Sequence, residues 1–355
     1  MKAKYFLTFF LLFQIILLQI LKFFPEFIEQ YYSNLFFQYT SNWSRIILSK
    51  FPFSVGDFIY GLLILMIFRW FWKIRKTWKS NWKINLLKIT NCLSVFYFIF
   101  HLLWAFNYYR LPLFDKMKID REYSDEDLLA FTKILIAKTN EIQVQINQDS
   151  TSRVIFPYNH NQVFKMNLNG YKNLSEQYSF FDYKYLSVKK SIFSLPLSYM
   201  GFGGYLNPFT NEAQINSLSP IYGLPMTSCH EMAHQIGYAS ESECNFIGFM
   251  ASIKNENLYF KYSGYTSALK YCLNNWEVRN PEIKQQLLKT VNIGILKNYQ
   301  ENIDFSKIYH TPIETGFEIF YDNFLKLNQQ KDGLDSYNKF VDLLVNYYKF
   351  TGNEL

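Results

Sequence analysis

The sequence predicts a helix-rich α+β domain that follows three transmembrane helices. Three observations support this fold class. Strongly apolar runs recur within the first ~110 residues, helical periodicity dominates the rest with short strand-like pieces between, and two histidines at helical spacing precede a second predicted helix start. With 355 residues, the chain has room for a membrane part and one sizeable further domain. We expect a membrane anchor at residues 1–108 and a single domain at residues 109–355.

The three predicted spans cover about residues 5–24, 57–73 and 86–108. Each is close to the ~20 apolar residues that cross the hydrocarbon core, and Trp and Tyr at their ends are typical of interfacial anchors. The first run also resembles a signal peptide, but residues 22–25 follow it where a small-x-small cleavage site would stand. Core helices of a soluble protein are the alternative, although three such runs are unusual there. We therefore expect three retained membrane helices.

The charges of the loops predict the orientation. The loop between the second and third spans has seven basic residues and no acidic one: Arg69, Lys73, Arg75, Lys76, Lys79, Lys83 and Lys88. The preceding loop, Lys22 to Gly56, carries three basic and two acidic residues. Because strongly basic loops stay in the cytoplasm, the N-terminus should lie inside the cell membrane and the domain beyond about Tyr109 outside it. We expect a multi-pass inner-membrane protein with an extracytoplasmic, or periplasmic, domain.

Composition argues against two other classes of protein. The formal charge of +7 does not indicate nucleic-acid binding, because the basic residues concentrate beside the membrane segments and form no stripe with nucleic-acid-motif spacing. The four cysteines, Cys92, Cys229, Cys244 and Cys272, show no C-x-x-C spacing and predict no disulfide framework. The expected partners are the lipid bilayer and a peptide or protein substrate, and the sequence does not indicate an oligomeric state.

The H-E-x-x-H motif from His230 to His234 carries the predicted chemistry. Two histidines four residues apart stand on one helix face, so both imidazoles can reach one metal ion, while Glu231 can contact a water on that ion. With so few histidines, a chance match is expected about 0.006 times in this chain. Histidines that merely pack in the core or lie on the surface are the alternative. We favour a Zn²⁺ site of the hydrolase type.

A catalytic zinc ion needs a third protein ligand, which we expect from the following helix. Ser240 occupies the position of the third histidine in the metzincin pattern, so that pattern fails. Gly237 can end the first helix in a left-handed conformation, and Ser240 can cap a second helix. Ser240 and Glu243 have capping-box spacing, which gives Glu243 a local role and leaves Glu241 as the predicted ligand.

Asn245 supports this choice, because it lies on the same helix face as Glu241 and its amide can orient a zinc-bound histidine. Two alternatives remain open. Glu241 can instead be a carboxylate that the dipole of the helix N-terminus favours. A slightly longer turn after the first helix would present Glu243 to the metal in place of Glu241.

These residues carry a resemblance to known families. Residues 241–245 resemble the E-x-x-[AC]-D element that supplies the third zinc ligand and its partner in membrane-bound gluzincin peptidases, with Asn245 in place of aspartate and a shorter gap after the second histidine. More widely, the chain resembles an uncharacterised bacterial family of membrane-anchored zincin-like proteins at residues 204–216, 225–235 and 321–326, and at Gly333, Ser336 and Tyr337. The resemblance covers nearly the whole chain. It implies a zincin-like domain with zinc-dependent peptidase activity and supplies no substrate.

The remaining elements of the domain follow from periodicity and turn signals. We expect helices at 124–148, 281–297, 312–327 and 334–348, and short strand-like pieces with turns between 154 and 197. Residues 212–216 alternate polar and apolar, which predicts a half-exposed strand or an ordinary loop. In zincins, which this chain resembles, an edge strand beside the active helix pairs with an extended substrate.

The predicted reaction is hydrolysis of a peptide bond. Zn²⁺ held by His230, His234 and Glu241 would activate water, and Glu231 would take its proton and pass it to the leaving amine. Candidates for stabilising the oxyanion are Tyr337 and then His310 or Tyr321, each of which can instead serve packing or the surface.

Two other classes of function are the alternatives. An inactive zinc-binding sensor or scaffold would keep both histidines but has no need of Glu231. An intramembrane protease would place the motif within a span, and residues 229–246 are too polar for that.

Overall fold

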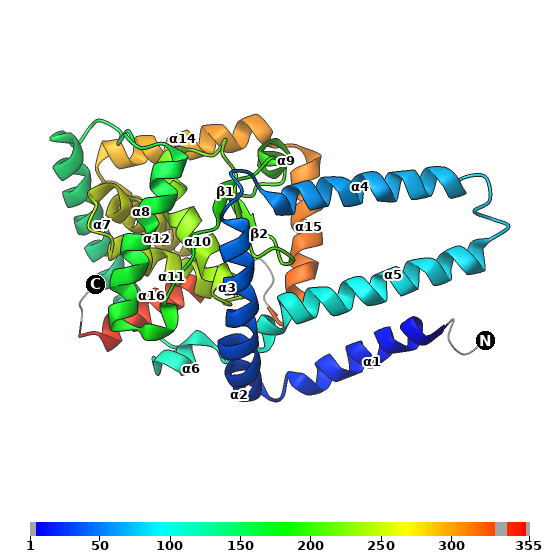
Figure 1. The fold of residues 1–355 in the computed structure, drawn as a ribbon. Helices are drawn as coiled ribbons and strands as arrows, with labels where there is room; N and C mark the ends of the chain where they lie inside the picture. The colour runs from blue at the N-terminus through cyan, green and yellow to red at the C-terminus, as the bar shows by residue number, and fades with distance from the viewer. Residues whose placement is uncertain (1–4, 331–338, 353–355) are drawn as a thin grey trace.

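The fold is known from a computed structural model that describes residues 5–330 and 339–352. Three long helices, α1 (Phe6–Leu21), α4 (Val55–Ile74) and α5 (Trp82–Leu103), project from one side of a helical domain (Figure 1). Helix α1 lies beside α5, and Gln14 Nε2 donates to the carbonyl of Ser94 at 3.3 Å. Three long helices thus project from a helix-rich remainder of the described chain.

Helices α4 and α5 are each long and apolar enough to cross a membrane. Helix α1 has 16 residues and then bends by 104° into the segment Pro25–Leu48, so it counts as a third span only if the bent pair is taken together. Within the described residues there are thus two or three candidate spans where three were predicted. The predicted third span ran to residue 108, but α5 ends at Leu103 and a 3₁₀ helix, Ala105–Tyr109, follows.

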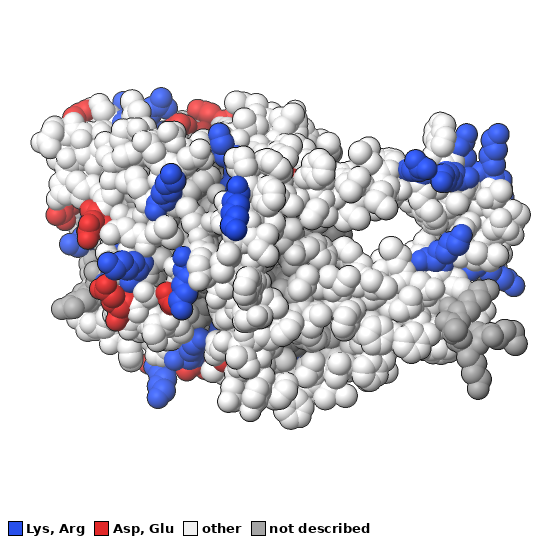
Figure 2. Space-filling model, in the orientation of Figure 1, with Lys and Arg blue, Asp and Glu red and all other residues white. Residues whose placement is uncertain are grey.

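Charge is distributed as a membrane protein requires (Figure 2). Lys and Arg gather at the far end of α4 and α5, around the loop that joins them, and the visible sides of the helices between that end and the domain are almost free of charge. Acidic and basic residues appear together again on the domain itself. An apolar layer therefore separates a basic tip from the mixed-charge domain.

The domain is built mainly from helices, in agreement with the predicted α+β class. Its shorter elements in chain order are α2 (Pro25–Phe27), the π-helix η2 (Ile28–Phe36), α3 (Phe37–Leu48), η3 (Ala105–Tyr109), α6 (Leu113–Met117), η4 (Ser179–Phe181), α9 (Ser194–Tyr199) and η5 (Ile221–Gly223). Its longer helices are α7 (Asp125–Asn147), α8 (His160–Gln177), α10 (Leu224–Gln235), α11 (Glu241–Ile253), α12 (Leu258–Arg279), α13 (Pro281–Leu288), α14 (Ile293–Tyr309), α15 (Pro312–Leu327) and α16 (Lys339–Phe350). Helices α10, α11 and α12 pack together at the centre, with α7, α8 and α16 around them.

A small sheet lies beside α10 and has the strand order β1-β3-β2. Strands β1 (Val188–Lys190) and β3 (Ala213–Ile215) are parallel, and β2 (Gly204–Leu206) pairs antiparallel with β3. The predicted strand at 212–216 exists, but the expectation that it is half-exposed and at the edge is wrong, because β3 is central and buried. The two edge strands of the sheet are β1 and β2.

The polar residues of β3 misled the prediction because they are buried with partners. Gln214 Nε2 donates to Ser54 Oγ at 2.8 Å. The carboxylate of Glu212 accepts from the backbone N–H of Gly56 at 2.6 Å and pairs with Lys189. These contacts attach the first turn of α4 to the sheet, so this candidate membrane span is joined to the domain through buried polar groups.

Three further expectations need correction or completion. The region 154–197 was expected to hold short strand-like pieces, yet it contains α8, which has 18 residues and begins with a capping box between Asn159 and Gln162.

The helix predicted at 281–297 is broken, because Asn140 bonds both the carbonyl of Thr290 and the N–H of Asn292 and so fixes a turn there. Helix α15 matches its predicted range, and the helix predicted at 334–348 is described only from Lys339.

Candidate metal centre

Helix α10 presents His230 and His234 on one face, as their spacing predicts. The two imidazole centroids lie 4.8 Å apart with their planes nearly perpendicular. The helix is held from behind by α8, because Tyr171 donates its hydroxyl to the carbonyl of Cys229 at 2.6 Å and Asn167 bonds Ser228. The two rings are therefore carried by a helix whose backbone is fixed in the core.

Gly237 ends α10 in the left-handed conformation that the sequence predicts, with φ at +92°. Its N–H donates to His234 O, and the N–H of Tyr238 donates to Ala233 O, which is the hydrogen-bond pattern of a Schellman motif. A Cβ at this position would lie 3.0 Å from a ring carbon of Phe37. Glycine is therefore required both by the backbone angle and by the packing, and the chain turns back at once.

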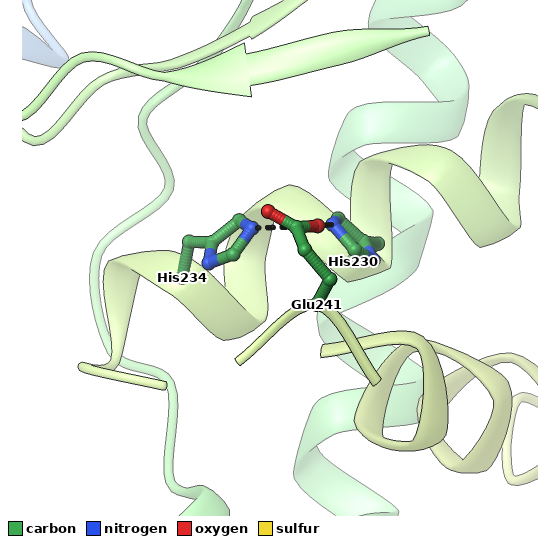
Figure 3. Close-up of side chains that lie close together, drawn as sticks. All are labelled: His230, His234 and Glu241. Carbon is green, nitrogen blue, oxygen red and sulfur yellow. Dashed lines mark ion pairs between the residues drawn. The ribbon is translucent and has the colours of Figure 1, made fainter. Parts of the chain in front are cut away.

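Helix α11 brings Glu241 to the two histidines (Figure 3). Its Oε2 lies 3.1 Å from His230 Nε2 and 3.7 Å from His234 Nε2, and the ligand atoms of all three residues lie within 4.8 Å of one another. The two helices approach closely because of Gly248, where a Cβ would meet His230 N at 2.9 Å. The predicted triad of His230, His234 and Glu241 is thus assembled and can hold a metal ion.

Glu243 points away from the triad, but not for the predicted reason. The expected capping box is absent, since Ser240 makes no side-chain cap hydrogen bond and its Oγ lies 2.9 Å from Ser242 Oγ. Glu243 Oε1 instead accepts from the N–H of Leu113, the first residue of α6, at 2.6 Å. Burial raises the pKa of Glu243 to about 7. The capping prediction is wrong, while the choice of Glu241 over Glu243 agrees with the structure.

The Nδ1 atoms of both histidines have oxygen partners. His230 Nδ1 lies 2.9 Å from Asn245 Oδ1, the partner predicted from its position, and His234 Nδ1 lies 2.8 Å from the carbonyl of Tyr238. Carbonyl and amide oxygens only accept, so each Nδ1 carries the proton and each Nε2 keeps its lone pair. Two imidazole nitrogens and a carboxylate oxygen therefore converge on one point, an arrangement that a metal ion, or a proton on an imidazole, stabilises.

The donor set is compatible with a zinc ion. Two histidine nitrogens and one carboxylate leave a fourth position open, and bond lengths of ~2.0–2.1 Å in a tetrahedron require ligand atoms about 3.3 Å apart. The two Nε2 to Oε2 distances lie on either side of that value. Burial opposes the ionisation of Glu241, but the attraction of His234, when its imidazole is protonated, and the bonds to both histidines outweigh burial and hold the pKa of Glu241 well below the usual value.

Glu231 is buried beside the triad and is incompletely hydrogen-bonded. Among the residues that the structure describes, its Oε2 has no hydrogen-bond partner. Burial raises its pKa, so the carboxyl holds a proton more readily than an exposed glutamate. An unsatisfied buried oxygen costs about 1–3 kcal/mol. Such a group is suited to exchange a proton with a water molecule or a substrate.

Strand β2 runs next to Glu231. A Cβ on Gly204 would lie 3.0 Å from Glu231 Oε1 and 2.8 Å from the carbonyl of Gln214. Asn216 N donates to Gly203 O and Asn207 N donates to Glu212 O. Because bonded pairs alternate along an antiparallel ladder, the backbone groups of Gly204 and Leu206 point to the opposite, outer edge of β2.

Aromatic residues cover the triad on its other side. Tyr321 of α15 donates its hydroxyl to Glu241 Oε1 at 2.7 Å, and its ring packs on Phe202. Trp104, just after α5, makes an edge contact with the ring of His234. Both histidine side chains and Glu241 are at most 12% exposed. The centre is therefore a closed site at the junction of the domain, α5 and α15.

The three oxyanion candidates lie in different places. Tyr321 reaches the triad, as described. His310 is exposed and pairs with Glu314 at 2.7 Å, away from the three ligands. Tyr337, the first candidate, lies outside the described residues. Sequence reasoning missed Trp104 and the carbonyl of Tyr238, although a left-handed glycine three residues after His234 predicts a chain reversal near that ring.

Comparison with known proteins gives a family and no function. No curated protein and no solved structure matches the chain. Residues 32–345 match a protein family that is described as "Protein of unknown function (DUF3810)". This segment begins in the π-helix before α3, includes the whole metal centre and ends in α16. Because the match covers far more than half of the sequence, the chain belongs to the DUF3810 family.

Proposed function

We propose that this protein is a membrane-anchored, zincin-like zinc metallopeptidase that hydrolyses peptide bonds on the extracytoplasmic side of the cell membrane. The observation that carries the proposal is the buried triad of His230, His234 and Glu241, beside which one carboxylate oxygen of Glu231 has no hydrogen-bond partner among the described residues. A metal site that serves structure alone closes its coordination and needs no free carboxylate. This combination supports hydrolysis over simple metal storage.

Each residue has a defined task in the proposed reaction. A zinc ion, when bound, supplies Lewis acidity that lowers the pKa of water towards ~7 and polarises the scissile carbonyl. Glu231 accepts the proton of the attacking water and donates it to the leaving amine, for which its raised pKa is suited. Asn245 and the carbonyl of Tyr238 keep the two imidazoles oriented. Tyr321 holds Glu241 and is the oxyanion candidate within reach of the centre.

The outer edge of β2 supports a peptide substrate. An extended chain that pairs with the backbone groups of Gly204 and Leu206 would add a strand to the sheet and pass beside Glu231. Backbone pairing of this kind recognises the peptide bond itself. Side-chain preference would then come from the residues around the site.

The proposed orientation rests on the basic tip of α4 and α5. The domain lies at the opposite end of these helices (Figures 1 and 2). If the basic loop stays in the cytoplasm, the metal centre lies on the extracytoplasmic side of the membrane.

A second candidate function is a zinc-holding sensor or scaffold without catalysis. The low exposure of the triad under α15 favours it, because a closed site can report on metal or membrane state without turnover. Glu231 favours the peptidase, since a sensor needs no general base.

Glu231→Gln separates the two functions, because it removes the base and leaves all three ligands. Full-length wild-type and variant protein, reconstituted in vesicles with Zn²⁺, should be incubated with a peptide library, and the extracytoplasmic proteomes of cells that carry each form compared. The peptidase proposal predicts cleavage sites with wild type that are lost in the variant, at equal zinc content. Identical peptide and protein profiles for the two forms would support the scaffold.

A further inference from the structure

Helix α15 has an apolar stripe that is exposed and that no described residue of the chain covers. Ile313, Phe320 and Leu327 are spaced by seven residues and are 62%, 61% and 79% exposed. Residues at this spacing lie on nearly one line along a helix. Such a row of large apolar groups costs free energy in water, so the stripe has a partner in the working protein.

The other sides of α15 have different tasks. The inner side carries Tyr321 over the metal centre and the buried Leu325. A third side carries the exposed Thr315 and the ion pair of Asp322 with Lys326, next to the exposed Ile319. The helix therefore presents three different sides, and only the inner side packs against the domain.

The position of α15 identifies the partner. The helix runs crosswise to α4 and α5 near their domain ends (Figure 1). The ring of Phe324 lies 6.3 Å from that of Phe100, which stands three residues before the end of α5. Since a helix rises 1.5 Å per residue, Phe324 lies beside a point on α5 that is about 4.5 Å from the domain end of this candidate span.

Other parts of the domain reach the same level. Phe209 packs on Phe96 at 5.1 Å, seven residues before the end of α5, or about 10 Å inside it. Ile192 and Leu195 are exposed, and the N–H of Ile192 bonds Asp57 in the first turn of α4. The apolar surface of the spans therefore continues onto the domain, over the loop before α9 and along α15.

We propose that the stripe of Ile313, Phe320 and Leu327 binds the lipid bilayer, with α15 lying in the boundary between headgroups and acyl chains. Amphipathic helices in this boundary bury their apolar face by roughly 5–10 Å, which agrees with the level of Phe324 and Phe209. The proposal extends beyond the proposed function, since it requires neither metal nor hydrolysis. A second copy of the chain is the rival occupant of the stripe.

Lipid contact on one face of α15 and the bond from Tyr321 to Glu241 on the other place the metal centre at the membrane surface. The geometry of the metal centre would thereby depend on how deeply α15 lies in the bilayer. Displacing the helix from the lipid would move the phenol that holds a metal ligand.

Spin-label accessibility tests the proposal in the full-length protein. Single labels are attached to Ile313→Cys, Phe320→Cys and Leu327→Cys in a Cys92→Ser background, because the other three cysteines are buried. Controls are Thr315→Cys on the third side of α15 and Val278→Cys on α12, which is 86% exposed. Each protein is placed in vesicles of phosphatidylethanolamine and phosphatidylglycerol, and collisions with molecular oxygen and with a water-soluble nickel chelate are compared.

The stripe labels should show an oxygen-to-nickel collision ratio several-fold higher than both controls. Stripe labels that the nickel chelate reaches as readily as it reaches position 278 would overturn the proposal. Labels shielded from both reagents, with spin–spin broadening that disappears on dilution with unlabelled protein, would assign the stripe to a second copy. If a stripe variant loses its native circular dichroism, Gly316→Cys replaces it, because a Cβ there meets nothing within 4 Å.

Discussion

Tyr321 and Glu241, 80 residues apart in the chain, share a hydrogen bond of 2.7 Å from the phenol to Oε1. The other oxygen of the same carboxylate faces the two histidine nitrogens. One residue of α15 therefore controls the position of a metal ligand on α11. The first prediction follows from this contact.

Tyr321→Phe should weaken zinc binding by roughly 10–100-fold, because partners that orient a ligand typically contribute that much affinity. Competition with a chromophoric zinc chelator measures the change. The matched control is Tyr299→Phe, whose hydroxyl bonds the carbonyl of Thr266 in the core. The control should lose about 1 kcal/mol of folding stability and keep its zinc affinity. Equal zinc affinity of both variants would remove Tyr321 from the site.

The two glutamates of α11 should separate in a metal titration. Glu241→Gln should weaken zinc strongly, because a neutral amide replaces a charged ligand that lies 3.1 Å from His230 Nε2. Glu243→Gln should retain the metal, because its side chain bonds the N–H of Leu113 instead. If Glu243→Gln lost the metal and Glu241→Gln kept it, the ligand would have to be reassigned.

Glu243 should also make stability depend on pH. Its pKa is raised by burial from 4.5 to about 7, although nearby Arg110 opposes this, so the folded state binds the proton more tightly than the unfolded state. Stability from this group is complete below pH 4.5 and is lost as pH rises to about 7, by roughly 3 kcal/mol in total. Glu243→Gln should therefore gain stability relative to wild type between pH 5 and about 8. Thermal unfolding in detergent measures the difference, and parallel curves for the two proteins would refute the assignment.

Gly204→Ala should impair activity more than its small size suggests. The added methyl would lie 3.0 Å from Glu231 Oε1 and 2.8 Å from the carbonyl of Gln214, so the strand or the base must move. Gly223→Ala is the control, since a Cβ there meets nothing within 4 Å. We expect a loss of about tenfold or more in peptide hydrolysis for the first variant, because catalytic geometry tolerates little displacement, and none for the second. Equal rates would place β2 outside the reaction.

The convergence of His230, His234 and Glu241 was predictable because its causes are local. The spacing of His230 and His234, the left-handed Gly237 and the start of α11 all follow from rules that act within a few residues, and together they bring Glu241 round. Asn245 was found for the same reason, by helix periodicity.

The errors have long-range causes. The polar pattern of 212–216 indicated an exposed strand, but Glu212 and Gln214 find partners in residues 54–56, more than 150 positions away. Glu243 had a plausible partner in Ser240 and a better one in the free N–H of Leu113 at the start of α6. The cover of the site by Trp104 and Tyr321 likewise depends on packing between the domain and α5. The failure to predict α8 had a different cause, because its capping box of Asn159 and Gln162 could be read from the sequence itself.

The most direct test of the account is the zinc content of the purified full-length protein at neutral pH, with both histidines intact and with both replaced by His230→Asn and His234→Asn. Elemental analysis after dialysis against buffer with trace zinc gives the stoichiometry, and circular dichroism shows that the variant is folded. The account predicts one zinc ion per chain in the wild type and none in the folded variant. A wild type without stoichiometric metal, or a variant that binds as much as the wild type, would contradict it.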